Sequence, residues 1–382
     1  FVLRPSEART ARAGRFGVNF DYSDDQKMLK DEARKFLAAK CDAKVVRGVL
    51  DNDDRAYDEA LWKGVAEQGW LGAAIPEEFG GLGLGHVELC GLAEELGRAC
   101  APIPFASTVY FVAEALMKFG SQEQKAKWLP KIAAGEVIGA FATSEGKGPV
   151  TARSIGATVS GGKLSGEKIP VTDGDVADLI VVLAKDGLYL VEKGEGVSAE
   201  VLTTLDPTRS AAKLTFSGAP AERLGDEDGL AAMQAVFDRA AILLAFEQVG
   251  GADKSLEMAK AYALDRQAFG RVIGGYQAIK HKLADMYVKN EIARSNAYFG
   301  AWALNTDTGE LPLAAATARV AASEAFWFAS KENIQTHGGI GFTWEADPQL
   351  YYRRSRQLSL VAGAPATWRE RLVSQLEMKN AA

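Results

Sequence analysis

Cysteine and histidine are both scarce in this chain of 382 residues, with three of each. The cysteines are odd in number and lack CxxC spacing, which argues against a disulfide framework and a zinc site and fits a reducing compartment such as the cytoplasm. No two histidines stand four residues apart, so no histidine-rich metal centre is expected. These residues are Cys41, Cys90, Cys100, His86, His281 and His337.

Long apolar runs and an excess of positive charge are missing as well. No stretch of about 18 uninterrupted apolar residues occurs, so we expect no membrane span. The 44 Lys and Arg residues are outnumbered by 50 Asp and Glu residues, and a net charge of -6 argues against a broad nucleic-acid surface. A composition of 47% hydrophobic and 25% charged residues is typical of a soluble globular protein, and the length predicts two or three packed units.

The residue pattern divides the chain into four parts. Residues 1–21 are predicted to be a leader or a tag-like extension, since they carry several arginines and no apolar signal-peptide core. An apolar period of about 3.6 residues predicts a helical domain over 22–136 and another over 227–382. Between them, at 137–226, short β-branched runs separated by turn residues predict an antiparallel β domain. The order α, β, α without βαβ alternation excludes a Rossmann sheet and predicts an α+β fold.

Individual elements are expected within this outline. Helices are predicted over 59–68, 86–98, 108–119, 122–134, 230–264, 276–305, 312–335 and 365–376, after a first helix that begins near Asp24. Strands are predicted over 179–183, 187–191 and 212–216.

Three motifs in fixed order resemble the hallmarks of the acyl-CoA dehydrogenase family. The first is the glycine-rich loop at 76–83, which taken alone also fits a simple chain reversal. The second is Asp-Arg-Gln-Ala-Phe-Gly-Arg at 265–271, followed by Tyr-Gln-Ala at 276–278. The third is Gln-Thr-His-Gly-Gly-Ile-Gly at 335–341. The resemblance runs from about residue 22 to 372, and it implies the family's fold, with a four-helix bundle as the C-terminal domain.

The resemblance also implies FAD as the cofactor and assigns residues to it. Ala142 and Thr143 match the positions at the isoalloxazine ring, and the Thr172 hydroxyl matches the one that reaches ring atom N5. Arg266 resembles the arginine that pairs with the diphosphate of a neighbouring subunit's cofactor, with Phe269 packing nearby. The remaining candidates, Gln277, Gln335, Gly338 and Gly339, belong to the segments that approach the dinucleotide.

A family member removes the α-proton of an acyl-CoA thioester with a carboxylate base, while the β-hydrogen leaves as hydride to the flavin. An electron-transfer flavoprotein then reoxidises the flavin. The expected partners are therefore an acyl-CoA, that flavoprotein, and further subunits in a homodimer or homotetramer. A heteromer with a catalytic sister subunit is the alternative.

The sequence departs from the family at the base. Ala362 occupies the usual glutamate position, and the family's second location falls on Ala240. Asp238 lies two residues before that point and Glu247 seven after it, so both are candidates and the catalytic base is unknown. Two flavin contacts also differ: Pro149-Val150 replaces a Ser-Asp pair, and Pro170 replaces a tryptophan.

Four interpretations remain open. The chain is an active dehydrogenase with a relocated base, or a non-catalytic subunit that shares FAD with a sister chain. Alternatively, it is a flavin-dependent monooxygenase on the same fold, or a binding protein of this fold without a cofactor.

Overall fold

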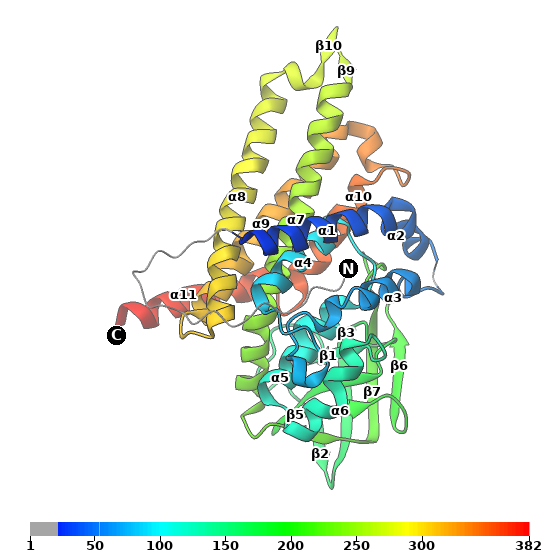
Figure 1. Ribbon diagram of the computed structural model, residues 1–382, viewed down its shortest axis with the longest axis vertical. Coiled ribbons are helices and arrows are strands. Elements are labelled where there is room, and N and C mark those ends of the chain that lie inside the picture. The colour runs from blue at the N-terminus through cyan, green and yellow to red at the C-terminus, as the bar shows by residue number, and fades with distance from the viewer. Residues whose placement is uncertain (1–21, 53, 382) are drawn as a thin grey trace.

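The computed structural model describes residues 22–52 and 54–381, so the leader predicted over 1–21 lies outside the described residues. Three layers follow one another along the chain, as Figure 1 shows: N-terminal helices, a β domain at the lower end, and long C-terminal helices that rise into an arm. This order confirms the predicted fold class.

The N-terminal domain consists of short helices that begin at capping residues. Ser23 starts the first helix by accepting a hydrogen bond from the Gln26 amide at 3.2 Å, and Gln26 bonds back to Ser23. The helices are α1 (Asp24–Lys40), α2 (Ala43–Leu50), α3 (Glu59–Glu67), α4 (His86–Arg98), α5 (Glu114–Phe119) and α6 (Gln122–Ala133), with short 3₁₀ turns at Trp70–Gly72 and Glu77–Phe79.

The helix predicted over 108–119 begins earlier than expected and has two parts. Its first part is the π-helical segment η3 (Ala106–Ala113), and α5 continues from it. Every residue of η3 is buried, so the segment has no polar face whose period would mark its start.

The middle domain contains two four-stranded sheets. The first has the order β1 (Gly139–Ala142), β4 (Leu179–Ala184), β5 (Gly187–Glu192), β8 (Glu222–Leu224). The second has the order β2 (Thr158–Ser160), β3 (Lys163–Thr172), β7 (Ala211–Pro220), β6 (Val197–Val201). The predicted antiparallel domain is confirmed with one exception, because β1 and β4 are parallel. All six residues of β4 are buried, which explains its uninterrupted apolar run.

The C-terminal domain is built on three long helices, α7 (Gly229–Asp265), α8 (Gln277–Thr306) and α9 (Leu311–His337). The far ends of α7 and α8 form the arm in Figure 1, and the β9 (Gln267–Ala268) and β10 (Arg271–Val272) hairpin lies at its tip. The shorter α10 (Pro348–Leu360) and α11 (Pro365–Ala381) complete the domain. The predicted helical domain is confirmed, although α10 was not expected.

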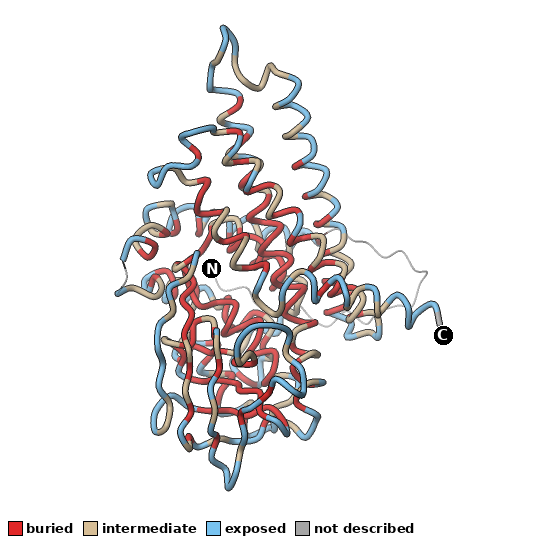
Figure 2. Tube along the Cα trace, turned by 180° about the vertical axis from the view of Figure 1, so that it is seen from behind, coloured by how far each residue is buried: buried red, intermediate tan, exposed pale blue. Residues whose placement is uncertain are grey.

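One helix, α7, is long and apolar enough to cross a membrane by length and composition alone. In this fold 72% of its apolar window is buried inside the protein. Figure 2 shows the buried residues concentrated where the long helices cross the rest of the molecule, so α7 serves as a core helix.

Candidate active site

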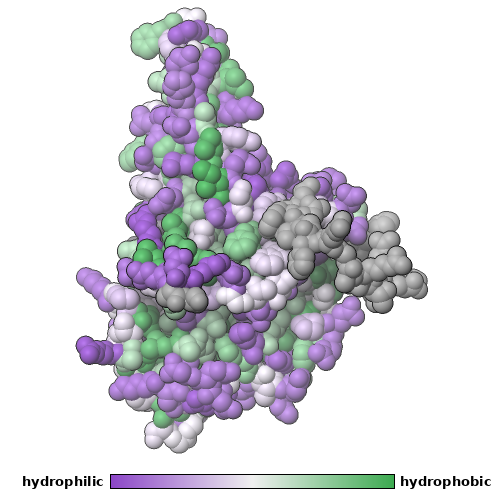
Figure 3. Space-filling model, turned by 90° about the vertical axis from the view of Figure 1, so that its left-hand side faces the viewer, coloured by the Kyte–Doolittle hydropathy of each residue, from purple (hydrophilic) through white to green (hydrophobic). Residues whose placement is uncertain are grey.

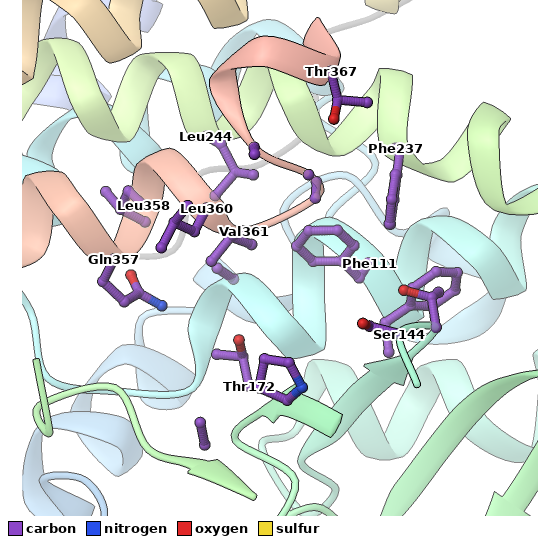
Figure 4. Close-up of a pocket in the computed structure, with 18 of the residues that line it drawn as sticks. Phe111, Ser144, Thr172, Phe237, Leu244, Gln357, Leu358, Leu360, Val361 and Thr367 are labelled. Atoms are coloured by element: carbon purple, nitrogen blue, oxygen red, sulfur yellow. The ribbon is translucent and has the colours of Figure 1, made fainter. Parts of the chain in front are cut away.

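A cavity of about 800 Å³ lies between the β domain and the C-terminal helices. Figure 4 shows Thr172 on the β side facing Leu358, Leu360 and Val361 across it, with Phe111 and Phe237 along one flank. The wall is therefore mostly apolar, with a small number of polar groups from β strands and loops. A mostly apolar hollow of this size is typical of a small-molecule site.

The predicted flavin-ring residues lie at this cavity. Thr143 and Thr172 both line it, and neither hydroxyl has a hydrogen-bond partner among the described residues. Lys168 fixes the first of them, because its Nζ donates to the Thr143 carbonyl at 3.2 Å and pairs with Glu145 at 2.7 Å. Ala142 lies next to Thr143 but is fully buried and does not reach the cavity. Two free hydroxyls on one wall fit the polar edge of an isoalloxazine ring.

The residues that replace family flavin contacts border the same cavity. Pro149, Val150 and Pro170 all line it. They contribute apolar surface where the resemblance implies a serine, an aspartate and an indole ring.

Ala362 lies on the opposite wall with a backbone φ of +61°. Its carbonyl accepts a hydrogen bond from the Trp368 indole at 3.0 Å, which holds the turn between α10 and α11. The side chain is a methyl group, so this wall supplies no proton acceptor at the usual base position.

Neither predicted base candidate lines the cavity. Glu247 is fully buried on α7 and pairs with Arg209 at 2.7 Å and Arg354 at 3.6 Å. Asp238 is 4% exposed and pairs with Arg371 at 2.5 Å. Burial raises the pKa of Asp238 to about 7, although Arg371 acts in the opposite direction. The cavity is therefore lined by Arg209 and Arg371, the arginine partners of these acids, and not by the two acids themselves.

Among the described residues, Asp206 is the one carboxylate that lines the cavity. It pairs with Arg354 at 2.8 Å and accepts a hydrogen bond from the Thr208 hydroxyl at 2.5 Å. An arginine thus neutralises this carboxylate too, and it serves to hold α10 against the β domain.

Two hydrogen-bonded serine–aspartate pairs at the cavity were not predicted from the sequence. Ser107 donates to Asp173 at 2.6 Å, and Ser210 donates to Asp175 at 2.6 Å. Both serines line the cavity, and both aspartates lie in the turn that follows Thr172. Two acids flanking Gly174 beside a candidate flavin threonine were the available sequence signal.

The other predicted cofactor residues lie far from the cavity. Arg266 caps the C-terminus of α7, and Leu244, the cavity-lining residue of α7 nearest to it in the sequence, precedes it by a rise of about 33 Å along an α-helix. That length exceeds an extended FAD molecule. The structure therefore separates the ring candidates from the candidates for the diphosphate and adenosine.

The distant candidates come together at the arm. Tyr262 on α7 stacks on His337 with ring centroids 4.2 Å apart, which places the loop after α9 beside the end of α7. Phe269 is 97% exposed at the tip, and no ion pair involving Arg266 occurs among the described residues. The remaining candidates, Gln277, Gln335, Gly338 and Gly339, are exposed.

The glycines of this cluster leave open space. A Cβ added at Gly338 or Gly339 meets nothing within 4 Å, and Gly338 has a φ of +66°. Glycine is thus required at position 338 by the positive φ of the backbone, not by a close contact within the chain. The open space, the Arg266 cation without an ion pair among the described residues and the exposed Phe269 ring leave this cluster free to contact an anionic group.

Comparison with known proteins agrees with this architecture. Residues 23–136 match the model for the N-terminal domain of acyl-CoA dehydrogenases, and residues 227–376 match the model for their C-terminal domain. Acyl-CoA dehydrogenase IpdE2 from Mycobacterium tuberculosis is 35% identical over 356 residues, covering 92% of this chain and 98% of that protein.

The chain belongs to the acyl-CoA dehydrogenase family. It is an oxidoreductase of this FAD-dependent family, whose members act in fatty-acid and related metabolism. The free hydroxyls of Thr143 and Thr172 at the cavity and the Arg266 side chain, which has no ion pair among the described residues, are polar groups available to a bound molecule.

Two solved structures have the same fold. One, described as the electron transferring flavoprotein of Acidaminococcus fermentans, has a TM-score of 0.87 and 29% identity, covering 94% of this chain and 99% of its own. The other is the ChsE4-ChsE5 complex from Mycobacterium tuberculosis, with a TM-score of 0.85, 26% identity and coverage of 94% and 99%.

Proposed function

We propose that this protein catalyses α,β-dehydrogenation of an acyl-CoA thioester and passes the electrons to an electron-transfer flavoprotein. The observation that carries the proposal is the 800 Å³ cavity, which has two free threonine hydroxyls on one wall and apolar side chains on the other. FAD supplies hydride acceptance when bound. The protein positions the thioester, excludes water with its apolar wall, and must accept one proton.

The apolar wall is suited to hold an acyl group. Phe111, Phe141 and Phe237 form an aromatic cluster with ring centroids 5.8 to 6.1 Å apart, and all three line the cavity. Such a wall favours hydrocarbon over water, because apolar contact removes both surfaces from solvent. The class of substrate that fits is an acyl chain or ring system attached to a thioester.

The distance between the two groups of cofactor residues supports a flavin shared between subunits. A second chain would bring its Arg266 and Phe269 to the diphosphate of the flavin whose ring lies against Thr172. Each site then requires at least two chains, which supports a dimer or a dimer of dimers.

The electron acceptor and the compartment are proposed on separate grounds. A structural relative described as an electron transferring flavoprotein supports the first. The three cysteines are free and buried, which supports a reducing compartment such as the cytoplasm.

Anaerobic titration tests the proposed reaction. The purified flavin-containing protein is mixed with a panel of saturated acyl-CoAs, and the oxidised flavin absorbance is recorded. We expect bleaching with at least one thioester, together with the matching enoyl-CoA by mass spectrometry. Absence of bleaching with every thioester would falsify the proposal.

A second candidate function is a non-catalytic subunit that shares FAD with a sister chain. It is favoured by Ala362 and by the pairing of Asp206, Asp238 and Glu247 with arginines. A relative that is a complex of two differently named chains supports it as well. Bleaching only after a sister chain with glutamate at the usual position is added would decide for this candidate.

A further inference from the structure

The two serine–aspartate pairs at the cavity differ in their surroundings. In the first, Ser107 Oγ lies 2.6 Å from Asp173 Oδ2, and Asp173 is 2% exposed. In the second, Ser210 Oγ lies 2.6 Å from Asp175 Oδ1, and Asp175 is only half-buried. In the first pair, the Asp173 carboxylate is therefore shielded from solvent and is connected to the cavity by the Ser107 hydroxyl.

We propose that Ser107 and Asp173 together accept the substrate α-proton, in place of the absent glutamate. This inference rests on the proposed dehydrogenation. The Ser107 proton points to Asp173, since a charge-assisted bond is stronger than the alternative bond to the Pro104 carbonyl at 3.1 Å. A lone pair of Ser107 Oγ is then free to face the cavity.

The proton step balances without a further reagent. The α C–H bond breaks and its proton moves to Ser107 Oγ, while the Ser107 hydroxyl proton moves to Asp173 Oδ2. The electron pair of the C–H bond becomes the new carbon–carbon π bond, and bound FAD would supply the acceptor for the β-hydrogen as hydride. Ser107 ends as a hydroxyl and Asp173 as a neutral acid, which returns its proton to solvent after product leaves.

Asp173 differs from the other acids near the cavity in its partners. Asp206, Asp238 and Glu247 each form an ion pair with an arginine. The Asp173 carboxylate has a hydroxyl as its hydrogen-bond partner, and no ion pair to it occurs among the described residues. Asp175 also bonds a serine and has no ion pair among the described residues, but it is only half-buried, so Asp173 is the buried acid near the cavity without an arginine partner.

The electrostatic surroundings suit a base at neutral pH. Burial raises the pKa of Asp173 to about 6, Asp175 acts in the same direction, and Arg209, Arg354 and the Ser107 hydrogen bond act against it. A carboxyl with this pKa is ionised at pH 7 and still holds a proton better than an exposed aspartate. The backbone φ of Asp173 is +55°, a conformation that residues other than glycine rarely adopt.

The test measures proton removal separately from oxidation. A 3-thiaacyl-CoA has sulfur in place of the β-carbon, so its α-proton exchanges but no hydride leaves. Flavin-containing protein is incubated with this ester in D₂O, and deuterium at the α-carbon is followed by mass spectrometry. We expect Asp173→Asn and Ser107→Ala to slow exchange by about 100-fold or more, a typical loss for a general base. Ser107→Thr keeps the hydroxyl and should recover part of the rate.

Asp175→Asn is the matched control, because it changes an identical contact in the neighbouring pair, and its exchange rate should stay within about threefold of wild type. The wild-type rate should also rise with pH through an apparent pKa near 6, and Asp173→Asn should lack that step. Flavin content and thermal melting verify that each variant is folded.

Three outcomes would overturn the relay: exchange at the wild-type rate in Asp173→Asn, an equal loss in Asp175→Asn, or no exchange by wild type. If wild type and Asp173→Asn bleach equally fast with an acyl-CoA, the relay is wrong and the proposed function stands. If wild type bleaches with no thioester, the proposed function fails.

Discussion

At the scale of single residues, the acids around the cavity differ by what each one touches. Glu247 is buried in an ion pair with Arg209 at 2.7 Å and does not line the cavity. A buried carboxylate that is bonded only to a hydroxyl keeps its affinity for a proton, as at Asp173. The chemical role of an acid in this protein therefore follows from its partner rather than from its position in a motif.

Asp173→Asn should stabilise the protein at pH 8. The folded-state pKa of about 6 is above the ordinary value of 3.8, so the folded protein binds the proton more tightly and loses stability as pH rises between these values. The full effect is a loss of about 3 kcal/mol above pH 6, which asparagine avoids while still accepting the Ser107 hydrogen bond. Urea unfolding at pH 8 and pH 4 measures it.

The gain in Asp173→Asn should be absent at pH 4, where the wild-type carboxyl is protonated in the folded state. An equal gain at both values of pH would show that ionisation is not its cause.

Ala362→Glu should supply a base where the chain has a methyl group. Ala362 lines the cavity, and its φ of +61° is already adopted by a residue with a Cβ, so glutamate adds little backbone strain. In the Asp173→Asn background we expect this substitution to raise the rate of flavin bleaching by about tenfold or more. Stopped-flow absorbance with a reactive acyl-CoA provides the measurement.

Ala362→Gln is the control for that substitution, because glutamine has the size of glutamate without its proton affinity. A comparable rise in Ala362→Gln would attribute the effect to shape.

At the scale of elements, α4 and α7 cross at two glycines. A Cβ at Gly97 would lie 1.8 Å from the Glu247 carbonyl, and a Cβ at Gly250 would lie 1.8 Å from the Glu94 carbonyl. The two backbones therefore touch, which fixes α7 against the N-terminal domain and with it the cavity wall that carries Phe237.

Gly250→Ala should destabilise the protein, since either helix must move by more than an ångström to admit the methyl group. Alanine favours a helix by about 1 kcal/mol over glycine. Overpacking at a backbone contact costs about 3 kcal/mol or more, so the net change is unfavourable. Differential scanning calorimetry measures the fall in melting temperature.

Gly91→Ala is the matched control for Gly250→Ala, because Gly91 also lies inside a helix, α4, and its added Cβ would make only ordinary contacts at 3.9 and 4.0 Å. An unchanged melting temperature in Gly250→Ala would show that the two helices do not touch as described.

Secondary structure was predictable where one face of an element meets solvent. The predicted helix over 86–98 matches α4, whose pattern mixes buried and partly exposed positions. The strand run at 179–183 matches β4 for another reason, because a short β-branched run between turn residues marks a strand that is buried on both faces. The predicted start of the helix over 108–119 was wrong, because the residues of η3 are buried on all sides and so show no helical period of apolar residues. The contact between Ser107 and Asp173 joins residues 66 positions apart, so no local pattern marks it.

At the scale of the whole molecule, the motifs that the family resemblance assigns to one cofactor lie far apart in space. Thr172 and Arg266 both match FAD contacts, yet α7 carries the chain from the cavity to the tip of the arm (Figure 1). The family resemblance already implied that Arg266 reaches the cofactor of a neighbouring subunit, but the sequence alone gives no distance between the two groups of residues. The long rise of α7 supplies that information.

The surface of the arm supports a role in assembly. Val288 and Ile292 on α8 and Phe342 after α9 are exposed, the last at 84%. Figure 3 shows apolar side chains among hydrophilic ones along the arm, on the side where α8 lies. Exposed apolar surface on a projecting element is typical of contact with another subunit.

Flavin retention should depend on protein concentration, because each proposed site takes groups from two chains. Dilution separates the chains by mass action and removes Arg266 from the diphosphate of the other chain's cofactor. Arg266→Ala should weaken retention by about tenfold or more at fixed concentration, the effect of losing a charge-assisted contact. Lys185→Ala, which removes an exposed cation from the turn between β4 and β5, should leave retention unchanged. Flavin fluorescence released on serial dilution provides the measurement, and retention that is independent of concentration in wild type would show that one chain holds the cofactor alone.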